Sequence, residues 1–337
     1  MNMSEGKLRI ETSLNSSGTL FNENKISILR EKDYYIIDYP LDGDAPKQFI
    51  KIYCYKPKSK IRRSRPKTWE PYIAKTAEKW YPHESVIEYM INKIGLCFDI
   101  RMNEVKLVKA NNQIRFLSKY FLNKNEVLYH GADICGEYLE DEQFAREVAN
   151  NRRTARDLFT YEFVTDAIES VFKRHSGQLI TDLNKILIFD AIVGNNDRHF
   201  YNWAVVTYKK RTKKIPFISP IYDTARGLMW NQSDKQIEKL RMLESSQFEK
   251  KINDYIFNSY PRISIEKNKN ANHFDLIGFI KKQKSEYSDI IDEMASHENE
   301  KHVFCVLEDE IFPFFLKQRC EVISLILKKR FEIIRGL

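Results

Sequence analysis

A short polar loop is the part of this sequence whose residue types are best suited to chemistry. An apolar run ends at Gly194, and the loop that follows contains Asp197, His199 and Asn202. A second carboxylate, Asp223, follows a second apolar segment. Phosphoryl transfer needs such a set, because one Asp orients the attacking hydroxyl and accepts its proton, while an Asn and a second Asp hold Mg²⁺ against the phosphates.

The spacing within the loop supports this interpretation. In kinase catalytic loops the metal-binding Asn comes five residues after the catalytic Asp, and Asn202 lies five residues after Asp197. A solvated turn can also be rich in Asp and Asn, but here the spacing and the later Asp223 occur together. We therefore predict that Asp197 is the catalytic base or the residue that orients the acceptor, and that Asn202 and Asp223 are the Mg²⁺ ligands.

The order of these residues resembles that of one family. The patterns NxDRHxxNW at residues 195–203 and PIYD at residues 220–223 resemble those of the HipA-like kinases, including the short bacterial HipA-related serine/threonine kinases. Ordinary protein kinases place His and Arg before the Asp. Phosphatidylinositol kinases share DRHxxN, but they would continue the second metal site as Asp-Phe-Gly, whereas Thr224 and Ala225 follow here. The resemblance implies a kinase that uses ATP and Mg²⁺ to phosphorylate serine or threonine of a protein.

The elements around the loop predict an α+β, bilobal protein-kinase-like (HipA-like) fold. Short apolar segments separated by turn residues predict strands in the first part of the chain. After residue 141 the apolar residues recur at a spacing near 3.6, which predicts helices. We place a β-rich, nucleotide-binding N-lobe at residues 1–121, and a helical C-lobe with the catalytic and metal-binding loops at residues 122–337.

A strand lysine and a helix carboxylate are expected in the N-lobe, where the lysine reaches the ATP phosphates. The strand predicted at residues 49–55 carries Lys51 shortly before Pro57, as in the HipA-like pattern. Lys51 could also be only the solvent-facing residue of an edge strand. Glu84, in the first turn of the next predicted helix, is the expected partner of the lysine, with Glu88 as the alternative.

The adenine and phosphate contacts leave less trace in the sequence. The segment 114–121 resembles the strand that leads into the interlobe hinge of the family, which makes Ser118 and Tyr120 candidate nucleotide-binding residues. No G-x-G-x-x-G motif is present. Residues 16–18 (Ser-Ser-Gly) or 42–44 (Asp-Gly-Asp) could cover the phosphates, so this loop and any inhibitory autophosphorylation serine are left unassigned.

Three further residues of the catalytic loop have roles in this interpretation, and His199 is a candidate catalytic residue together with Asp197. His199 could contact the γ-phosphate, support Asp223, or be a buried, hydrogen-bonded histidine. We expect Arg198 and Asn195 to brace the loop.

The composition is that of a folded protein in a reducing compartment. A length of 337 residues with 42% hydrophobic residues is enough for two lobes with their own cores. The five cysteines are scattered and form no C-x-x-C pair, which predicts reduced thiols. The sequence has neither an apolar signal segment nor a stretch long enough to span a membrane. We therefore predict a cytoplasmic protein without membrane association, acting in its own cell or after translocation into a host cell.

The net charge of +8 favours acidic partners, although a lysine-rich surface would give the same value. The basic run at residues 56–67 has no aromatic residue inside it, so we do not expect nucleic acid as a direct substrate. HipA-like proteins often act as toxins that an antitoxin restrains. Full-length HipA has an extra N-terminal subdomain for which there is no room before Lys51, so the compact stand-alone or translocated kinases are the closer comparison.

We therefore expect a protein substrate, a role as a toxin or effector, and an antitoxin or other regulator as a candidate partner. Two alternatives remain open at this point. One is a lipid or small-molecule kinase on the same core, which the DRHxxN element allows. The other is a non-catalytic, nucleotide-binding interaction module that uses the basic patches.

Overall fold

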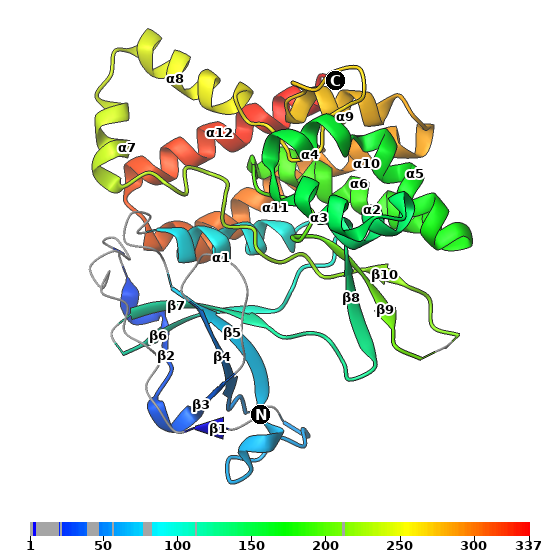
Figure 1. Ribbon diagram of the computed structural model, residues 1–337. Helices are drawn as coiled ribbons and strands as arrows, with labels where there is room; N and C mark the ends of the chain where they lie inside the picture. The colour runs from blue at the N-terminus through cyan, green and yellow to red at the C-terminus, as the bar shows by residue number, and fades with distance from the viewer. Residues whose placement is uncertain are drawn as a thin grey trace.

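The chain folds into a β-rich part and a helical part, with helix α1 (Glu84–Gly95) lying between them (Figure 1). The structure is a computed structural model. It describes residues 3–4, 20, 22–38, 47–55, 57–76, 83–111, 113–210 and 213–337. The predicted α+β class is confirmed. The boundary predicted between residues 121 and 122 stays a prediction.

The β-rich part is a seven-stranded sheet in the order β1-β3-β4-β5-β7-β6-β2. All neighbouring strands are antiparallel except β2 and β6, which are parallel. The strands are β1 (Met3–Ser4), β2 (Ser27–Ile28), β3 (Tyr34–Ile37), β4 (Lys47–Ile52), β5 (Glu70–Lys75), β6 (Val105–Ala110) and β7 (Gln113–Lys119). A second, three-stranded sheet contains β8 (Glu126–His130), β9 (Ala204–Tyr208) and β10 (Phe217–Ile218).

The alternation of side chains along the strands decides which residues can reach a ligand. Ile50 and Tyr72 lie on the face that forms a small core of its own. Lys75 and its neighbour in register, Phe116 of β7, lie on the other face. Helix α1 packs on β6 and β7. Lys75 therefore lies on the face of the sheet that looks toward the helical part.

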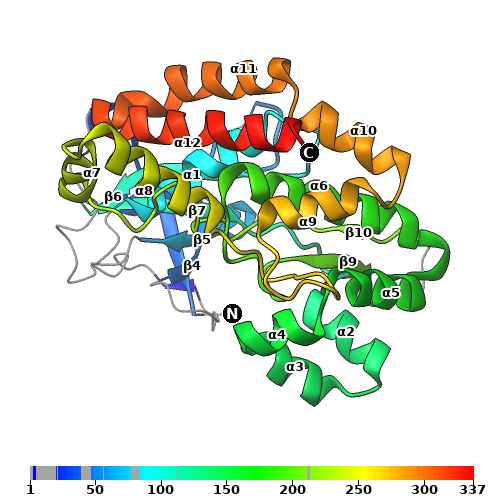
Figure 2. The ribbon, with the colours of Figure 1, turned by 90° about the horizontal axis from the view of Figure 1, so that it is seen from above.

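Helix α6 (Ser176–Val193) is the centre of the helical part, and α5, α9, α10 and α12 contact it. Its residues 186–193 are all buried, which explains why this stretch of the sequence is apolar on every side except at Asp190. Figure 2 shows α12 alongside α11, with α6 and α9 on its other side. The remaining helices are α2 (Gly131–Leu139), α3 (Glu142–Asn150), α4 (Arg152–Leu158), α5 (Tyr161–Phe172), α7 (Asp234–Arg241), α8 (Ser245–Phe257), α9 (His273–Lys281), α10 (Ser285–Met294), α11 (His297–Val306) and α12 (Lys317–Arg335).

Gly194 ends α6 and starts the polar loop. Its φ of +68° lies in the left-handed region, which favours glycine at a helix end. A Cβ at this position would also lie 2.8 Å from the guanidinium of Arg330, a buried side chain of α12. Both the backbone and the packing therefore require glycine where the chain turns into the loop.

Two other expectations from the sequence can be compared with the structure. None of the five cysteines, all of which lie in the described part of the chain, forms a disulfide with another. Within the described part of the chain, no helix has the length and apolar character needed to cross a membrane.

Candidate active site

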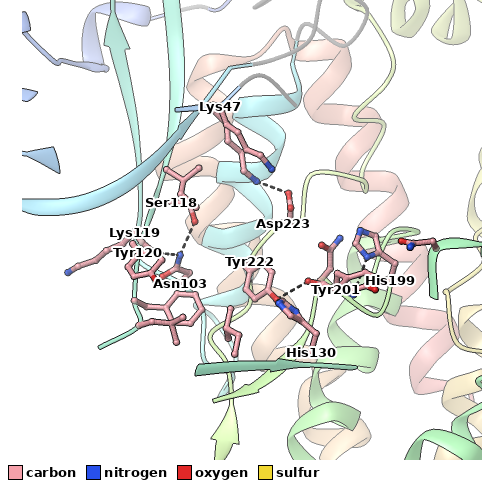
Figure 3. A pocket seen from close by; sticks show the side chains of 17 residues that line it. Lys47, Asn103, Ser118, Lys119, Tyr120, His130, His199, Tyr201, Tyr222 and Asp223 are labelled. Carbon is pink, nitrogen blue, oxygen red and sulfur yellow. Dashed lines mark hydrogen bonds and ion pairs between the residues drawn. The ribbon is translucent and has the colours of Figure 1, made fainter. Parts of the chain in front are cut away.

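A cavity of about 650 Å³ lies where the large sheet, the small sheet and the polar loop meet (Figure 3). Its volume is in the range of small-molecule and cofactor sites. Its apolar lining includes Ile73, Phe121 and Leu128, and its polar lining includes Lys75 and Asp223.

Lys75, at the end of β5, bridges two carboxylates. Its Nζ lies 2.9 Å from Oε1 of Glu88 on α1 and 2.6 Å from Oδ1 of Asp223. Glu88 is only 3% exposed, whereas 45% of the Asp223 side chain is exposed toward the cavity. The lysine therefore links the sheet, helix α1 and the loop after β10.

The electrostatics of this cluster keep Lys75 and Asp223 charged, whereas burial raises the pKa of Glu88. Burial opposes the positive charge of Lys75, but the attraction of Asp223 and Glu88 outweighs it and raises the lysine pKa. The Lys75 charge in turn lowers the pKa of Asp223 to about 2 against the effect of burial. Asp223 is thus a carboxylate at neutral pH.

A buried ion pair between Arg198 and Asp190 holds the polar loop against helix α6. Arg198 donates from Nε and Nη2 to the two carboxylate oxygens of Asp190 on α6, at 2.9 Å each. Its Nη1 donates to the carbonyls of Asn202, at 2.9 Å, and Tyr222, at 3.1 Å. Asn195 Nδ2 also donates to Asp190, at 2.9 Å. Arg198 and Asn195 therefore brace the loop as expected.

Asn202 is oriented by the same loop. Its Nδ2 donates to the carbonyl of Asp197 at 2.8 Å, which leaves Oδ1 as the atom available to a cation. Asn202 and Asp223 both line the cavity. Mg²⁺ is usually held by one or two protein oxygens together with substrate phosphates and waters. This pair of oxygen ligands fits Mg²⁺ bound together with a nucleotide.

Asp223 has a backbone conformation that is rare for residues other than glycine. Its φ is +57°, in the left-handed region, which Asp tolerates better than most residues. Such conformations cost energy and persist where the surrounding structure fixes them. Here the surrounding bonds are the Lys75 contact and the Arg198 bond to the preceding carbonyl, which together direct the carboxylate into the cavity.

His199 lines the cavity beside Asn202, and Figure 3 shows its ring next to Tyr201. Its Nδ1 accepts from the Tyr201 backbone N–H at 3.2 Å. Burial lowers the pKa of His199; the negative charge of Asp197 opposes this shift, and the positive charge of Arg262 adds to it. A neutral ring that accepts at Nδ1 carries its proton on Nε2. His199 is therefore a half-buried, hydrogen-bonded histidine that retains one N–H donor.

Asp197 lies beside the cavity and does not line it. Two arginines from distant parts of the chain contact its carboxylate. Arg262 Nη2 forms a close ion pair with Oδ1, and Arg226 Nε lies 3.5 Å from Oδ2. The sequence patterns gave no indication of these contacts, because Arg262 lies in a loop between α8 and α9.

Lys51 and Glu84 are not brought together at the cavity, which corrects the expectation for the strand lysine. Lys51 does not line the cavity, and its Nζ donates to the Lys67 carbonyl at 2.9 Å. In the pairing of β4 with β5, Lys47 lies opposite Lys75, and Lys51 is four residues further along, or about 13 Å at the rise of a strand. Glu84 is buried in the first turn of α1, one turn before the carboxylate that meets the lysine.

The error has an identifiable source. The sequence patterns predict no strand between residues 55 and 84, and the proline at the second position of β5 is unfavourable inside a sheet. The apolar residues 72–74 directly before Lys75 are the signal that could have revealed it. Glu88, which we had named as the alternative carboxylate, is the one that contacts Lys75.

Ser118 and Tyr120 both line the cavity. Ser118 Oγ accepts from Asn103 Nδ2 at 2.8 Å, so its side chain is held within the protein. The Tyr120 backbone N–H donates to the Pro71 carbonyl at 3.0 Å, which fixes the chain as it leaves β7. The two proposed phosphate-covering segments, 16–18 and 42–44, lie outside the described residues.

Fold and site together define the class of the protein, since a sheet lysine, a helix carboxylate and an Asp–Asn loop surround a nucleotide-sized cavity as in protein kinases. The sequence matches the family described as HipA-like C-terminal domain over residues 41–301. The chain belongs to this family, and the predicted relationship is confirmed. A search of curated protein sequences found no match.

One solved structure shows the same fold, and a second matches more weakly. The crystal structure of the proinflammatory kinase CtkA of Helicobacter pylori matches with a TM-score of 0.67 and 17% identity, over 89% of this chain and 94% of that chain. HipA of Shewanella oneidensis MR-1, in a structure of a toxin–antitoxin system with HipB and operator DNA, gives a TM-score of 0.49 and 11% identity. That match covers 88% of this chain and 65% of the other. The similarity to CtkA shows that the kinase-like fold predicted from the sequence is correct.

Proposed function

We propose that this protein is an ATP-dependent kinase that transfers the γ-phosphate to serine or threonine of a protein substrate. Membership of the HipA-like family supports kinase activity in general. The observation that carries the proposal is the bridge from Lys75 to Glu88 and Asp223 at the cavity. A lysine held by a helix carboxylate, next to a carboxylate that can bind a metal, is the arrangement that phosphoryl transfer from ATP requires.

In this proposal each group of the cavity has one task. Lys75 binds the α- and β-phosphates, and Glu88 keeps it in position. Asn202 Oδ1 and Asp223 hold Mg²⁺, which neutralises charge on the phosphates when it is bound. Ser118 and Tyr120 belong to the segment that passes the adenine. His199 supplies an N–H donor toward the phosphates.

Asp197 acts on the acceptor and not on the nucleotide. Its position beside the cavity, and not in its lining, supports this separation. The carboxylate orients the acceptor hydroxyl and takes its proton late in the transfer. Serine or threonine as acceptor, and a role as a toxin or effector under an antitoxin-like regulator, rest on the family resemblance alone.

The test uses the full chain with labelled ATP and Mg²⁺, offered generic protein substrates and, separately, lipid vesicles. Lys75→Met should weaken ATP binding roughly tenfold or more, because one charge-assisted hydrogen bond is lost. Lys51→Met is the matched control, a lysine on the neighbouring strand that does not line the cavity, and it should bind ATP normally. The reverse result would remove Lys75 from the site. Transfer to lipid alone would establish a lipid kinase instead, and ATP binding without any transfer would favour an interaction module.

A further inference from the structure

Two arginines contact the Asp197 carboxylate outside the cavity lining, and a third lies near them. Arg262 and Arg226 contact its two oxygens. Arg152, at the start of α4, is close enough for the charges of Arg262 and Asp197 to act on its pKa, which burial and Arg262 lower and Asp197 raises. We call Arg152, Arg226 and Arg262 the arginine cluster.

The backbone around Arg262 is held rigidly. Arg156 of α4, a buried side chain, donates to the carbonyl of Pro261 and, at 2.9 Å each, to those of Lys269 and Ala271. Arg152 Nη2 donates to the Tyr260 carbonyl at 3.1 Å. Both residues before Arg262 are therefore bonded to α4. The position of its guanidinium is set by the fold and is not that of a free surface side chain.

Arg226 is positioned as well. Its guanidinium lies 4.5 Å from the centre of the Trp230 ring, an arrangement that holds a planar cation in place. It lies three residues after Asp223, so the cluster adjoins the proposed metal site along the chain.

The cluster carries more positive charge than Asp197 can neutralise. Two guanidinium groups contact the one carboxylate and the charge of Arg152 acts on the same pair, and Nε of Arg262 is buried without a hydrogen-bond partner in the part of the chain that the structure describes. Guanidinium groups have several N–H donors arranged to bind carboxylates and phosphates in pairs. The unused Nε donor of Arg262 therefore lies on the guanidinium that contacts Asp197, and the net charge of the cluster favours a second anion.

We propose that the arginine cluster binds an anionic side chain of the acceptor substrate, a carboxylate or a phosphorylated residue, close to the residue that receives the phosphoryl group. The inference rests on the proposed function in assigning Asp197 to the acceptor. The incoming anion competes with Asp197 for Arg262 and Arg226, and thereby releases the carboxylate to the acceptor hydroxyl. The site thus selects acidic substrates and prepares Asp197 at the same time.

The first experiment measures phosphotransfer to a serine peptide library in which one position at a time is Ala, Lys, Glu or phosphoserine. The wild-type chain should prefer Glu or phosphoserine over Ala at one position by about tenfold, as expected for a charge-assisted pair. Arg152→Gln should remove most of this preference, while Arg153→Gln, an exposed neighbour on α4, should keep it. No anionic preference in the wild type, or full preference in Arg152→Gln, would overturn the proposal. The Glu and phosphoserine arms separate the two sources of the anion.

The second experiment does not depend on turnover. Binding of N-acetyl-phosphoserine amide is measured by calorimetry on the wild type, on Asp197→Asn, and on Asp197→Asn combined with Arg262→Gln. Asp197→Asn should bind the probe several-fold more tightly than the wild type, because the competing carboxylate is gone, and the double variant should lose this gain. Equal binding by all three proteins would refute the anion site. If no peptide accepted a phosphoryl group, the proposed function would be overturned. The calorimetric binding measurement would still show whether the arginine cluster binds an anion.

Discussion

Removal of the Lys75 side chain should destabilise the protein by an amount that depends on pH. Lys75→Met leaves Glu88, which is 3% exposed, without its cation. A buried carboxylate without a partner avoids its charge by taking up a proton. Burial already raises the Glu88 pKa above its ordinary value of 4.5, and Lys75 is the main group that opposes this. Without Lys75, Glu88 should therefore be protonated in the folded protein at neutral pH.

The free energy needed to protonate Glu88 sets the size of the loss in stability. Each pH unit above the unfolded-state pKa of 4.5 costs about 1.4 kcal/mol. The loss is then on the order of 3 kcal/mol near pH 7 and on the order of 1 kcal/mol or less near pH 5. The sign follows from proton binding: folded Glu88 holds a proton that the unfolded chain has released, so stability falls as pH rises from 4.5 toward the raised folded-state pKa.

Urea unfolding of the wild type and Lys75→Met at the two pH values measures the loss in stability directly. Lys75→Met combined with Glu88→Gln provides the control, because it has no carboxylate to protonate. It should recover most of the stability at neutral pH and lose the pH dependence, although it should remain inactive. A Lys75→Met protein as stable as the wild type at neutral pH would refute the reasoning. So would a double variant no more stable than the single one.

Three further predictions concern Asp197, the two proposed metal ligands and the ion pair that supports the loop. Asp197→Asn should keep ATP affinity within about a few fold and lose transfer by orders of magnitude, since Asp197 acts on the acceptor; surviving transfer would exclude its catalytic role. Asp223→Ala and Asn202→Ala should each abolish Mg²⁺-dependent turnover, with the larger effect for the carboxylate. The phosphotransfer rate is measured as a function of Mg²⁺ concentration. An active Asp223→Ala protein would contradict the assignment of Asp223 as a metal ligand. Asp190→Ala should cost about 3–5 kcal/mol in urea unfolding, because it leaves Arg198 buried without its anion; a loss below about 1 kcal/mol would contradict that pairing.

The sequence was informative where function depends on neighbouring residues. Asp197 and Asn202 lie in one loop, and Gly194 and the apolar run before it indicated where that loop begins. The Arg198 brace could also be predicted, because its partners Asn202 and Asp190 lie within eight residues of it. The assignment of roles to these residues remains a prediction from their pattern.

Contacts between distant segments left no comparable pattern. Lys75 and Asp223 are 148 residues apart, and Arg262 is 65 residues from Asp197. Lys51 and Lys75 both follow apolar residues in short strands, and only the pairing of β4 with β5 decides which of them reaches the cavity. That pairing is fixed by tertiary packing, which outweighs local preference in strands.

The single guanidinium of Arg198 has a consequence for how the site can move. It bonds to the carbonyl of Asn202, to that of Tyr222 directly before Asp223, and to Asp190 on α6. The backbone at both proposed metal ligands is thereby bonded, through Arg198, to helix α6. Lys75 belongs to strand β5 on the opposite side of the cavity. A motion of the sheet away from the helices would break the Lys75–Asp223 contact, whereas the Arg198 bonds would continue to hold Asn202 and Tyr222 together.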